Sequence, residues 1–445
     1  MNTPFSALDP NVRRTMRFST LEGSFVQAFL NWTTGSALIG YMLYLGASPF
    51  EISLVGSVPL LAQITNPFAA YFAALFGRRK YLATIFSFVG RVLWLFAAFL
   101  PQLGLPESVR PMSLVVLVLV SSVFQSAAGT LWTAWMADVV PQNVRGRYFG
   151  VRAGVVGVVG MLANLAAGWF LDLVAEPLNF QIVMGVAVVS AMVGVVLYLF
   201  HYEPPVTGKQ LGFRATFIEP LRHANFRRFL LFAVYWQFAV MLAAPFVMAY
   251  FLDEAKLGFR NIAYWSVIIG IAGLFTTTLW GRLADRAGNK AVISIGTVLA
   301  GVAMPTSWIL LGLTDNIWFF WLSAVFDAMA WGAIGPAVFN LALASSPQTG
   351  RAAFIAIYGL LTGASGFIGG LLSAPLLELF KLLEFTVGGV SWTAFHWIFV
   401  LSGIARATAW VVLRPVEEEN AWRTRDVLQG IRISWRRLIF PWRSR

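Results

Sequence analysis

Asp327 is an acidic residue within a long apolar run, where a charge is hard to accommodate. It lies about 11 residues into the run 316–344, and Trp331 follows four residues later. A carboxylate near the middle of a lipid bilayer costs about 2.5–3.5 kcal/mol on insertion scales, so such a residue needs a function or a partner. A buried carboxylate that alternates between neutral and charged forms can carry a proton. Asp327 is therefore our first candidate for a proton-binding or substrate-cation site, and a structural ion pair with Arg406 is the alternative.

Glu22, near the beginning of the apolar run 20–45, is the second candidate for proton coupling. Pairing with nearby basic residues is the alternative role for this carboxylate. Arg91 lies in the middle of the run 81–100. We expect it to join a structural network with Gln63 and Asn66, if the runs that contain them are neighbours.

Amide and indole side chains form polar faces on four of the apolar runs. Gln27 and Asn31 are four residues apart, a spacing that places both on one face of a helix. Amides supply hydrogen bonds and indoles supply flat apolar contact, so such faces suit a cavity for an amphipathic organic solute. The alternative is ordinary hydrogen bonding between helices, worth about 0.6 kcal/mol for each contact. The other residues of these faces are Gln125, Trp132, Trp135, Trp236, Gln237, Asp327 and Trp331.

The composition excludes several other classes of chemistry. The sequence contains no Gly-x-x-x-x-Gly-Lys-Ser/Thr phosphate loop, so we do not expect ATP-driven transport by this chain alone. Three scattered histidines and no cysteine exclude the common zinc sites and any disulfide framework. We therefore expect no enzyme, no cofactor and no metal site. The net charge of +12 is scattered over short loops, which argues against a nucleic-acid partner.

The elements that must position these residues are membrane-spanning helices. Hydrophobic residues make up 58% of the chain and charged residues only 12%, against about 25% charged residues in soluble domains. An apolar helix of about 20 residues crosses the bilayer. The sequence contains twelve such runs, at 20–45, 51–76, 81–100, 112–138, 149–172, 180–200, 228–250, 260–281, 291–313, 316–344, 352–378 and 389–412.

These runs predict an all-α integral membrane protein with twelve transmembrane helices. A polar stretch over 201–227, rich in proline and arginine, separates an N-terminal six-helix half over 1–200 from a C-terminal half over 228–413. A basic tail follows over 414–445. Its interleaved arginine and tryptophan residues are typical of an amphipathic helix that binds anionic lipid, and a disordered basic anchor is the alternative.

The distribution of lysine and arginine predicts the orientation. Of the 32 basic residues, 26 fall in the termini and loops of one side and four in the loops of the other. Basic residues are enriched in cytoplasmic segments. We therefore expect a multi-pass protein of the cell's inner membrane with both termini in the cytoplasm.

Two sets of four glycines indicate that the two halves are related by an internal repeat. They have the same spacing at an offset of 209 residues, and Gln27 and Gln237 correspond at an offset of 210. Small residues on one helix face let another backbone approach closely. This face forms either a static helix pair or a surface along which the halves rock. The glycines are Gly150, Gly154, Gly157 and Gly160, and Gly359, Gly363, Gly366 and Gly369.

A charged decapeptide over 281–290, Gly-Arg-Leu-Ala-Asp-Arg-Ala-Gly-Asn-Lys, lies between two apolar runs. It closely resembles the signature loop of the major facilitator superfamily, which joins the second and third helices of each six-helix half. Residues 70–80 form a degraded copy, in which the glycine and the basic end remain and Ala74 occupies the aspartate position. The resemblance implies a secondary transporter in which the first and fourth helices of each half line a central cavity.

The resemblance also implies a mechanical role for the loop. Asp285 is expected to contact the inner end of the run 352–378 and neighbouring arginines, which holds the halves together in the outward-open state. A carboxylate near a helix N-terminus interacts favourably with the helix dipole. Ala74 weakens the corresponding contact in the first half. The residues assigned to this latch are Gly281, Asp285, Arg286, Gly288, Arg78, Arg79, Asp138, Arg145 and Arg351.

The sequence therefore predicts a monomeric secondary active transporter that moves a small organic solute by alternating access, coupled to protons. One alternative within transport is a facilitator or a carrier of a lipid-like substrate. The alternative of another class is a transporter-like protein that no longer transports and serves as a membrane sensor or assembly factor. Substrate identity and the direction of transport are not encoded in these patterns.

Overall fold

The computed structural model describes residues 8–69, 78–204, 213–347 and 351–418. The predicted contact of the tail with anionic lipid falls almost entirely on 419–445, outside the described residues. In the first half, the helices are α1 (Pro10–Thr33), α2 (Gly35–Tyr44), α3 (Pro49–Ala62), α5 (Arg79–Ala98), α6 (Arg110–Val139), α7 (Gln142–Leu173) and α8 (Leu178–Tyr198). Short 3-10 turns are η2 (Gln63–Thr65), η3 (Leu100–Gln102) and η4 (Glu107–Val109).

The second half repeats this order with more interruptions. Its helices are α10 (Ala224–Met241), α11 (Ala244–Ala249), α12 (Gly258–Ala287), α13 (Asn289–Val298), α14 (Met304–Thr314), α15 (Trp318–Ala344), α16 (Arg351–Lys381) and α17 (Ala394–Leu413). The π-helical turns η5 (Tyr250–Glu254) and η6 (Leu299–Ala303) extend α11 and join α13 to α14. The stretch predicted as a polar linker contains a helix, α9 (Phe213–Arg222).

Recognisable breakers account for the interruptions. α1 and α2 meet at Thr34, and Gly35 has a φ of 58°, a left-handed conformation that glycine adopts without steric cost. Pro245 and Pro305 stand near the starts of α11 and α14. Proline lacks the N–H that would continue the preceding helix, so the segments before both residues depart from regular α geometry.

The last apolar run begins later than its hydropathy indicates. Residues 389–392, predicted as the start of the final span, belong to a two-stranded hairpin of β1 (Phe385–Val387) and β2 (Val390–Trp392). The strands are antiparallel, with Phe385 opposite Trp392. Gly388 and Gly389 form the turn with φ values of 60° and 83°, the pattern of a tight two-residue hairpin. The prediction for these residues was wrong because an apolar strand and the end of an apolar helix look alike in hydropathy.

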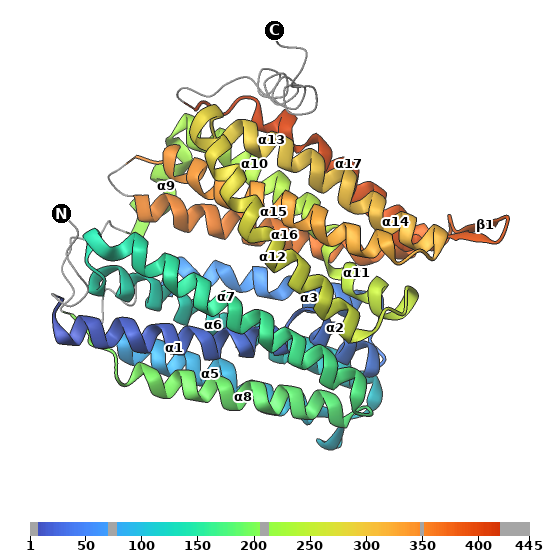
Figure 1. Ribbon diagram of the computed structural model, residues 1–445, viewed down its shortest axis with the longest axis horizontal. Coiled ribbons are helices and arrows are strands. Elements are labelled where there is room, and N and C mark those ends of the chain that lie inside the picture. Colours follow the sequence, from blue (N-terminus) through green and yellow to red (C-terminus); the bar gives the residue numbers. More distant parts are fainter. Residues whose placement is uncertain (1–7, 70–77, 205–212, 348–350, 419–445) are drawn as a thin grey trace, which may run out of the picture.

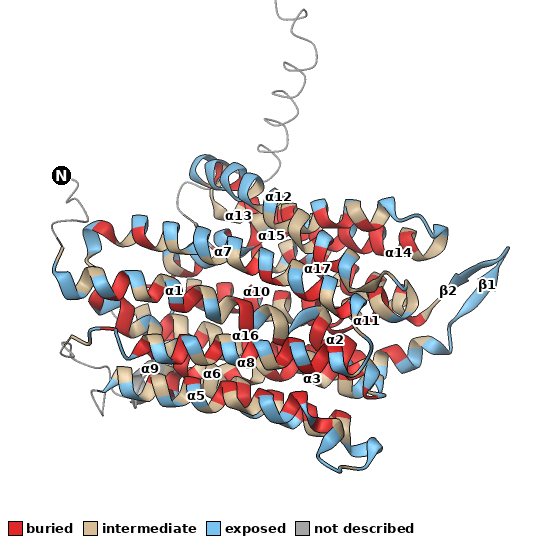
Figure 2. Cartoon of the chain, turned by 60° about the horizontal axis from the view of Figure 1, so that its bottom comes forward, coloured by how far each residue is buried: buried red, intermediate tan, exposed pale blue. Residues whose placement is uncertain are grey.

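The outer surface of the helix bundle is apolar. Leu173, Phe275 and Trp318 have exposed fractions of 83%, 73% and 74%, whereas buried residues concentrate between the helices (Figure 2). Within the described residues, eleven helical stretches are long and apolar enough to cross a membrane. The interrupted pair α1–α2 supplies the twelfth span, and its arginines and Glu22 lower its average hydropathy. The predicted all-α membrane fold of two six-helix halves is confirmed.

The two halves form two layers that lie face to face (Figure 1). The helices α1 to α8 make one layer and α10 to α17 make the other. We call the face at which α1 begins and α17 ends the terminal face, and the opposite face, which carries the hairpin, the far face. The contacts between the two layers differ between these two faces.

Candidate substrate cavity and conformational latch

Contacts between the halves close the far face. Ser53 of α3 donates a hydrogen bond to the carbonyl of Gly370 in α16, and its Oγ lies 2.9 Å from Ser373 Oγ. At the other seam, the carboxylate of Asp172 at the end of α7 accepts hydrogen bonds from the backbone N–H groups of Phe259 and Arg260 at 2.9 and 2.8 Å. A carboxylate at the N-terminus of α12 is stabilised by the helix dipole.

The surroundings of the glycines show how far the contact between the two halves extends from the far face toward the terminal face. A Cβ on Gly168 of α7 would lie 2.5 Å from the Cβ of Ala263 in α12, so these backbones touch near the far face. A Cβ on Gly150, Gly154 or Gly157 would meet no other described atom within 4 Å. The first-half glycine face is therefore uncovered on its terminal side, and α7 and α12 separate there.

The matching glycine face of the second half is covered. A Cβ on Gly363 of α16 would lie 2.6 Å from the carbonyl oxygen of Leu60 in α3, and one on Gly369 would lie 2.7 Å from the carbonyl oxygen of Phe238 in α10. Gly160, the last glycine of the first-half set, packs against Gln27 of α1. The repeat is thus preserved in sequence, but its two copies have different neighbours.

A cavity of about 480 Å³ lies within the first half. Side chains from every described helix of the first half and from η2 line it, and they include four of the predicted residues, Glu22, Gln27, Gln125 and Trp132. Asn31 lies behind this wall, where it accepts a hydrogen bond from Gln27 at 2.9 Å and donates one to the carbonyl of Gly160 at 2.6 Å. The predicted polar faces of α1 and α6 therefore come together.

Trp135 does not reach this cavity. Its ring is 1% exposed and packs against Tyr198 and His201, with centroid distances of 6.1 and 5.3 Å. The indole N–H donates to the carbonyl of Tyr202 at 2.9 Å. Burial lowers the pKa of His201 to about 4, so this histidine is a neutral packing partner at pH 7. Trp135 therefore anchors the end of α8 instead of lining the cavity.

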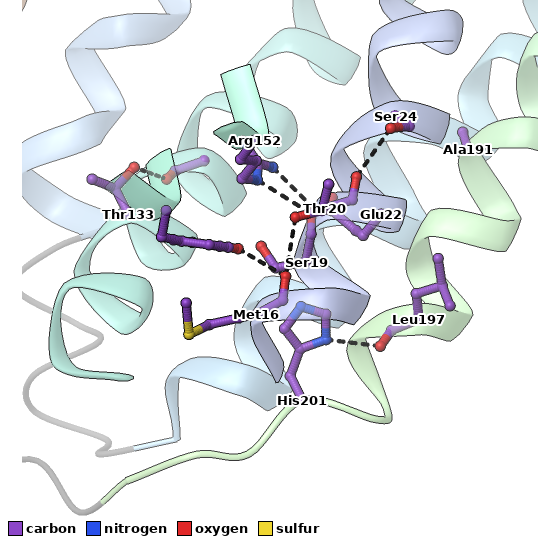
Figure 3. A network of polar contacts seen from close by, with 12 residues as sticks. Met16, Ser19, Thr20, Glu22, Ser24, Thr133, Arg152, Ala191, Leu197 and His201 are labelled. Atoms are coloured by element: carbon purple, nitrogen blue, oxygen red, sulfur yellow. Dashed lines mark hydrogen bonds and ion pairs between the residues drawn. The ribbon is translucent and has the colours of Figure 1, made fainter. Parts of the chain in front are cut away.

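A buried charged cluster forms one wall of the cavity. Glu22 is 3% exposed and pairs with Arg91 of α5 at 3.8 Å and with Arg152 of α7 at 3.5 Å. Figure 3 shows Arg152 reaching from α7 to Glu22 and Ser19 on α1, where its Nε donates to the Ser19 carbonyl at 3.2 Å. The predicted alternative of pairing with basic residues is therefore realised for Glu22.

The partners of Glu22 differ from those expected from the sequence. Arg91 contacts Glu22 and donates to the carbonyl of Ala191 at 3.2 Å, whereas its predicted network involved Gln63 and Asn66. Asn66 instead accepts a hydrogen bond from Ser126 at 2.7 Å. Arg152 was not predicted to be a site residue. A buried acidic residue in α1 requires cationic partners, and this requirement was the available signal.

The predicted residues of the second half lie in a more aromatic setting. Trp236 and Trp331 meet edge to face with ring centroids 5.9 Å apart, and Gln237 packs against Gly366. Asp327 interacts electrostatically with Arg406, but no nitrogen–oxygen pair between them lies within 4 Å. Arg406 donates instead to the carbonyl of Val240 at 3.1 Å. The close ion pair considered as the structural alternative is thus not formed in this conformation.

The predicted latch residues remain within their own halves. Arg79 pairs with Asp138, and Arg145 donates to the Ala137 carbonyl at 2.6 Å. Asp285 and Arg286 are exposed, and neither has a hydrogen bond or ion pair within the part of the chain that the structure describes. For the other latch residues, no hydrogen bond or ion pair across the halves occurs among the described residues. Gly288 ends α12 with a φ of 90°, Arg78 precedes α5, Gly281 is exposed, and Arg351 has an unpartnered Nε.

Two equivalent clasps tie the end of each half to the signature loops. In the first half, Glu203 accepts a hydrogen bond from the Lys80 N–H at 2.9 Å, while Lys80 Nζ donates to the carbonyls of Leu199 and His201. In the second half, Glu418 accepts from the Lys290 N–H at 2.8 Å, while Lys290 Nζ donates to two carbonyls just after α17. The repeat therefore extends to the segments that leave α8 and α17.

Removing a clasp carboxylate is expected to lower stability modestly. Glu418→Gln and Glu203→Gln each weaken a charged cap at a helix N-terminus, a loss of about 1 kcal/mol. We expect each variant to lower the Tm of the purified protein by about 2 °C. The control is Glu107→Gln, which removes an exposed pair with Arg110 and should leave the Tm unchanged. Equal Tm values for all three variants and the parent would contradict the assignment.

Comparison with known proteins identifies the family. The sequence profile of the Major Facilitator Superfamily matches residues 22–370 and 262–444. The multidrug resistance protein MdtG of Dickeya zeae (strain Ech586) is 32% identical over 143 residues, which cover 31% of this chain and 33% of that protein. The staphyloferrin B transporter of Staphylococcus aureus (strain NCTC 8325 / PS 47) is 23% identical over 283 residues, 60% of this chain and 64% of that protein.

Solved structures agree in fold. The nucleoside transporter NupG superposes with a TM-score of 0.72 at 13% identity and covers 91% of this chain and 100% of its own. The D-xylose-proton symporter gives a TM-score of 0.69 at 17% identity, with 92% and 99% covered. Together with the profile match and the twelve-span architecture, these similarities show that the chain belongs to the Major Facilitator Superfamily, a superfamily of membrane transporters rather than of enzymes.

Proposed function

We propose that this protein is a secondary active transporter that moves a small organic solute across the inner membrane by alternating access, coupled to protons. The observation that carries the proposal is the asymmetry between the two faces. Ser53 and Asp172 join the halves at the far face, whereas the terminal-side glycines of α7 are uncovered. Two halves that are joined at one face and uncovered at the other correspond to one state of an alternating-access cycle.

The orientation gives this state a direction. Lysine and arginine are concentrated on the terminal face, and the positive-inside rule assigns that face to the cytoplasm. The protein is then in an inward-facing state. In this state the latch is expected to be disengaged, and an exposed Asp285 agrees with a latch that engages when the protein opens outward. Asp327 and Glu22 remain the candidates for proton coupling, and we propose that the protein acts as a monomer.

The choice of solute remains broad. The similar proteins carry names that refer to multidrug resistance, staphyloferrin B, nucleosides and D-xylose, and these solutes share no single chemistry. The cavity of about 480 Å³, which is lined by polar and apolar side chains, favours transport over an assembly role, since an assembly protein needs no such space. A facilitator would use the same cavity without proton coupling.

A reversible cross-link tests alternating access. The parent chain has no cysteine, and Ser53 and Ser373 place their Oγ atoms 2.9 Å apart across the far face. In Ser53→Cys/Ser373→Cys, oxidation should lock the far face and stop uptake into liposomes, and reduction should restore uptake. The solute would be one identified by a stabilisation screen of the purified protein.

A second cysteine pair provides the matched control. Thr386→Cys/Ser391→Cys links the two strands of the hairpin, where the oxygens are 3.1 Å apart, and should leave uptake intact when oxidised. Uptake that continues through an oxidised Ser53–Ser373 link would rule out alternating access at this seam. Uptake with no accumulation under a pH gradient would identify a facilitator instead of a proton-coupled transporter.

A further inference from the structure

The cavity carries an excess of positive charge. Three charged residues occur among its described lining residues, Glu22, Arg91 and Arg152. One carboxylate therefore faces two guanidinium groups, both of which stay charged because arginine is not deprotonated in proteins. A buried net charge is unfavourable unless a partner neutralises it. The cavity wall thus lacks one negative charge.

Hydrogen-bonding capacity is unused at the same place. Arg91 has an exposed fraction of only 5%, and its Nε has no hydrogen-bond partner. The indole N–H of Trp132 is also unpartnered. Both residues line the cavity, as do two further groups without a hydrogen bond, Glu22 Oε2 and Ser87 Oγ. Glu22 Oε2 already lies 3.5 Å from Arg152, and a hydroxyl can donate as well as accept. The groups without a partner are therefore mainly donors, and because buried donors are normally paired, they favour a ligand that supplies an acceptor.

Arg152 is the group best placed to hold that acceptor. Its Nε is committed to the Ser19 carbonyl, and one terminal nitrogen lies 3.5 Å from Glu22, longer than a tight charged hydrogen bond. Its guanidinium lies over the Trp132 ring with 4.4 Å between the carbon centre and the ring centroid. This stacking fixes the plane of the guanidinium beside an apolar surface.

We propose that the transported solute is an organic anion. Its oxyanion group binds Arg152 and the vacant donors, and its apolar part packs against Trp132 and the aliphatic wall of the cavity. Glu22 occupies Arg152 when the cavity is empty and competes with the solute for it. This inference rests on the proposed transport function, because it names the class of solute for that same cavity.

The test compares three head groups on one apolar body. Purified full-length protein is titrated with straight-chain carboxylates of four to twelve carbons and with the amides and amines of equal length, and the thermal unfolding midpoint is recorded. We expect stabilisation by carboxylates at concentrations at least tenfold lower than by the matched amides or amines. Equal or better stabilisation by amides or amines, or no stabilisation by any carboxylate, would overturn the proposal.

Two substitutions should move the affinity in opposite directions. Arg152→Gln should weaken carboxylate binding at least tenfold, and Arg152→Lys should restore part of the loss. Glu22→Gln removes the internal competitor and should tighten carboxylate binding several-fold, a gain that misfolding cannot produce. The control is Arg110→Gln, a basic residue at the start of α6 outside the cavity, which should bind as the parent does. Weaker binding by Glu22→Gln would contradict the competition.

The outcome is separable from that of the transport proposal. Suppose that a neutral or cationic solute is taken up and that its uptake stops on oxidation of the Ser53–Ser373 pair. This result would support alternating access and refute the proposal that the solute is an anion. Suppose instead that carboxylates bind and that substitutions of Arg152 and Glu22 change their affinity as predicted, but that oxidation of the Ser53–Ser373 pair does not change uptake. This result would support the anion site and refute the transport cycle.

Discussion

Replacing Gly154 with leucine is expected to abolish transport while leaving the folded protein as stable as the parent. A Cβ added at this position of α7 would meet no described atom within 4 Å in the present conformation, so we expect a larger side chain to be tolerated there. Gly273 and Gly281 of α12 are equally uncovered. If the terminal face closes by bringing these helix segments together, leucine fills the space that closure needs, and uptake should fall at least tenfold.

Two further glycine variants give this prediction its controls. Gly185→Leu in α8 also enters open space. The contact of α8 with the second half lies at its start, where Phe180 meets Phe259 of α12, so a leucine at Gly185 should leave uptake intact. Gly168→Leu should act in the opposite sense, because its Cβ would lie 2.5 Å from Ala263 and 2.8 Å from the Phe259 carbonyl oxygen. Spin-label distances should show the far face pushed apart in Gly168→Leu and the terminal face held open in Gly154→Leu. Normal uptake by Gly154→Leu would show that this face does not close.

The second large effect is expected from Asp327→Asn. If Asp327 binds the coupled proton, asparagine imitates the protonated carboxyl permanently, so solute exchange across the membrane should continue while accumulation driven by a pH gradient disappears. The measurement is liposome uptake with and without the gradient, alongside counterflow exchange. Arg406 makes its described hydrogen bond to Val240 and no close ion pair with Asp327, so the Tm should change little.

The competing structural role predicts a different pattern. If the electrostatic interaction between Asp327 and Arg406 maintains the fold, Asp327→Asn should lower stability and remove exchange as well as accumulation. A double variant, Asp327→Asn/Arg406→Gln, should then recover folding. Gradient-driven accumulation that persists in Asp327→Asn with its normal pH dependence would transfer the coupling assignment to Glu22.

The sequence predicted the fold well because the bilayer restricts what an apolar run can do. A helix is the structure that satisfies the backbone of a single chain segment in lipid, so length and hydropathy located the spans. The hairpin over 385–392 is not subject to this restriction, and its second strand was assigned to the last helix. The interruption at Gly35 was also not visible, since one glycine in an apolar run does not specify a left-handed residue.

The candidate site was predictable only in part, because periodicity gives a face but not its rotation within the bundle. Trp132 and Trp135 are three residues apart and share a broad helix face, yet one lines the cavity and the other packs on His201. Glu22 could be identified as a buried charge, but its two partners come from α5 and α7. Which helices meet at a given depth is decided by packing, and a single sequence contains no direct record of it.

If the solute binds in this cavity, the residues that select the solute and the loop that controls the conformational change lie in different halves. Every described side chain that lines it comes from α1 to α8, whereas the complete signature loop belongs to α12 and the connection to α13. In the transport cycle that we propose, a solute bound in this cavity stays with the first half while the second half moves past it and controls access. Substitutions in the first half would then change which solute is carried without altering the movement of the second half. Such a division allows the same moving parts to serve new solutes over the course of evolution.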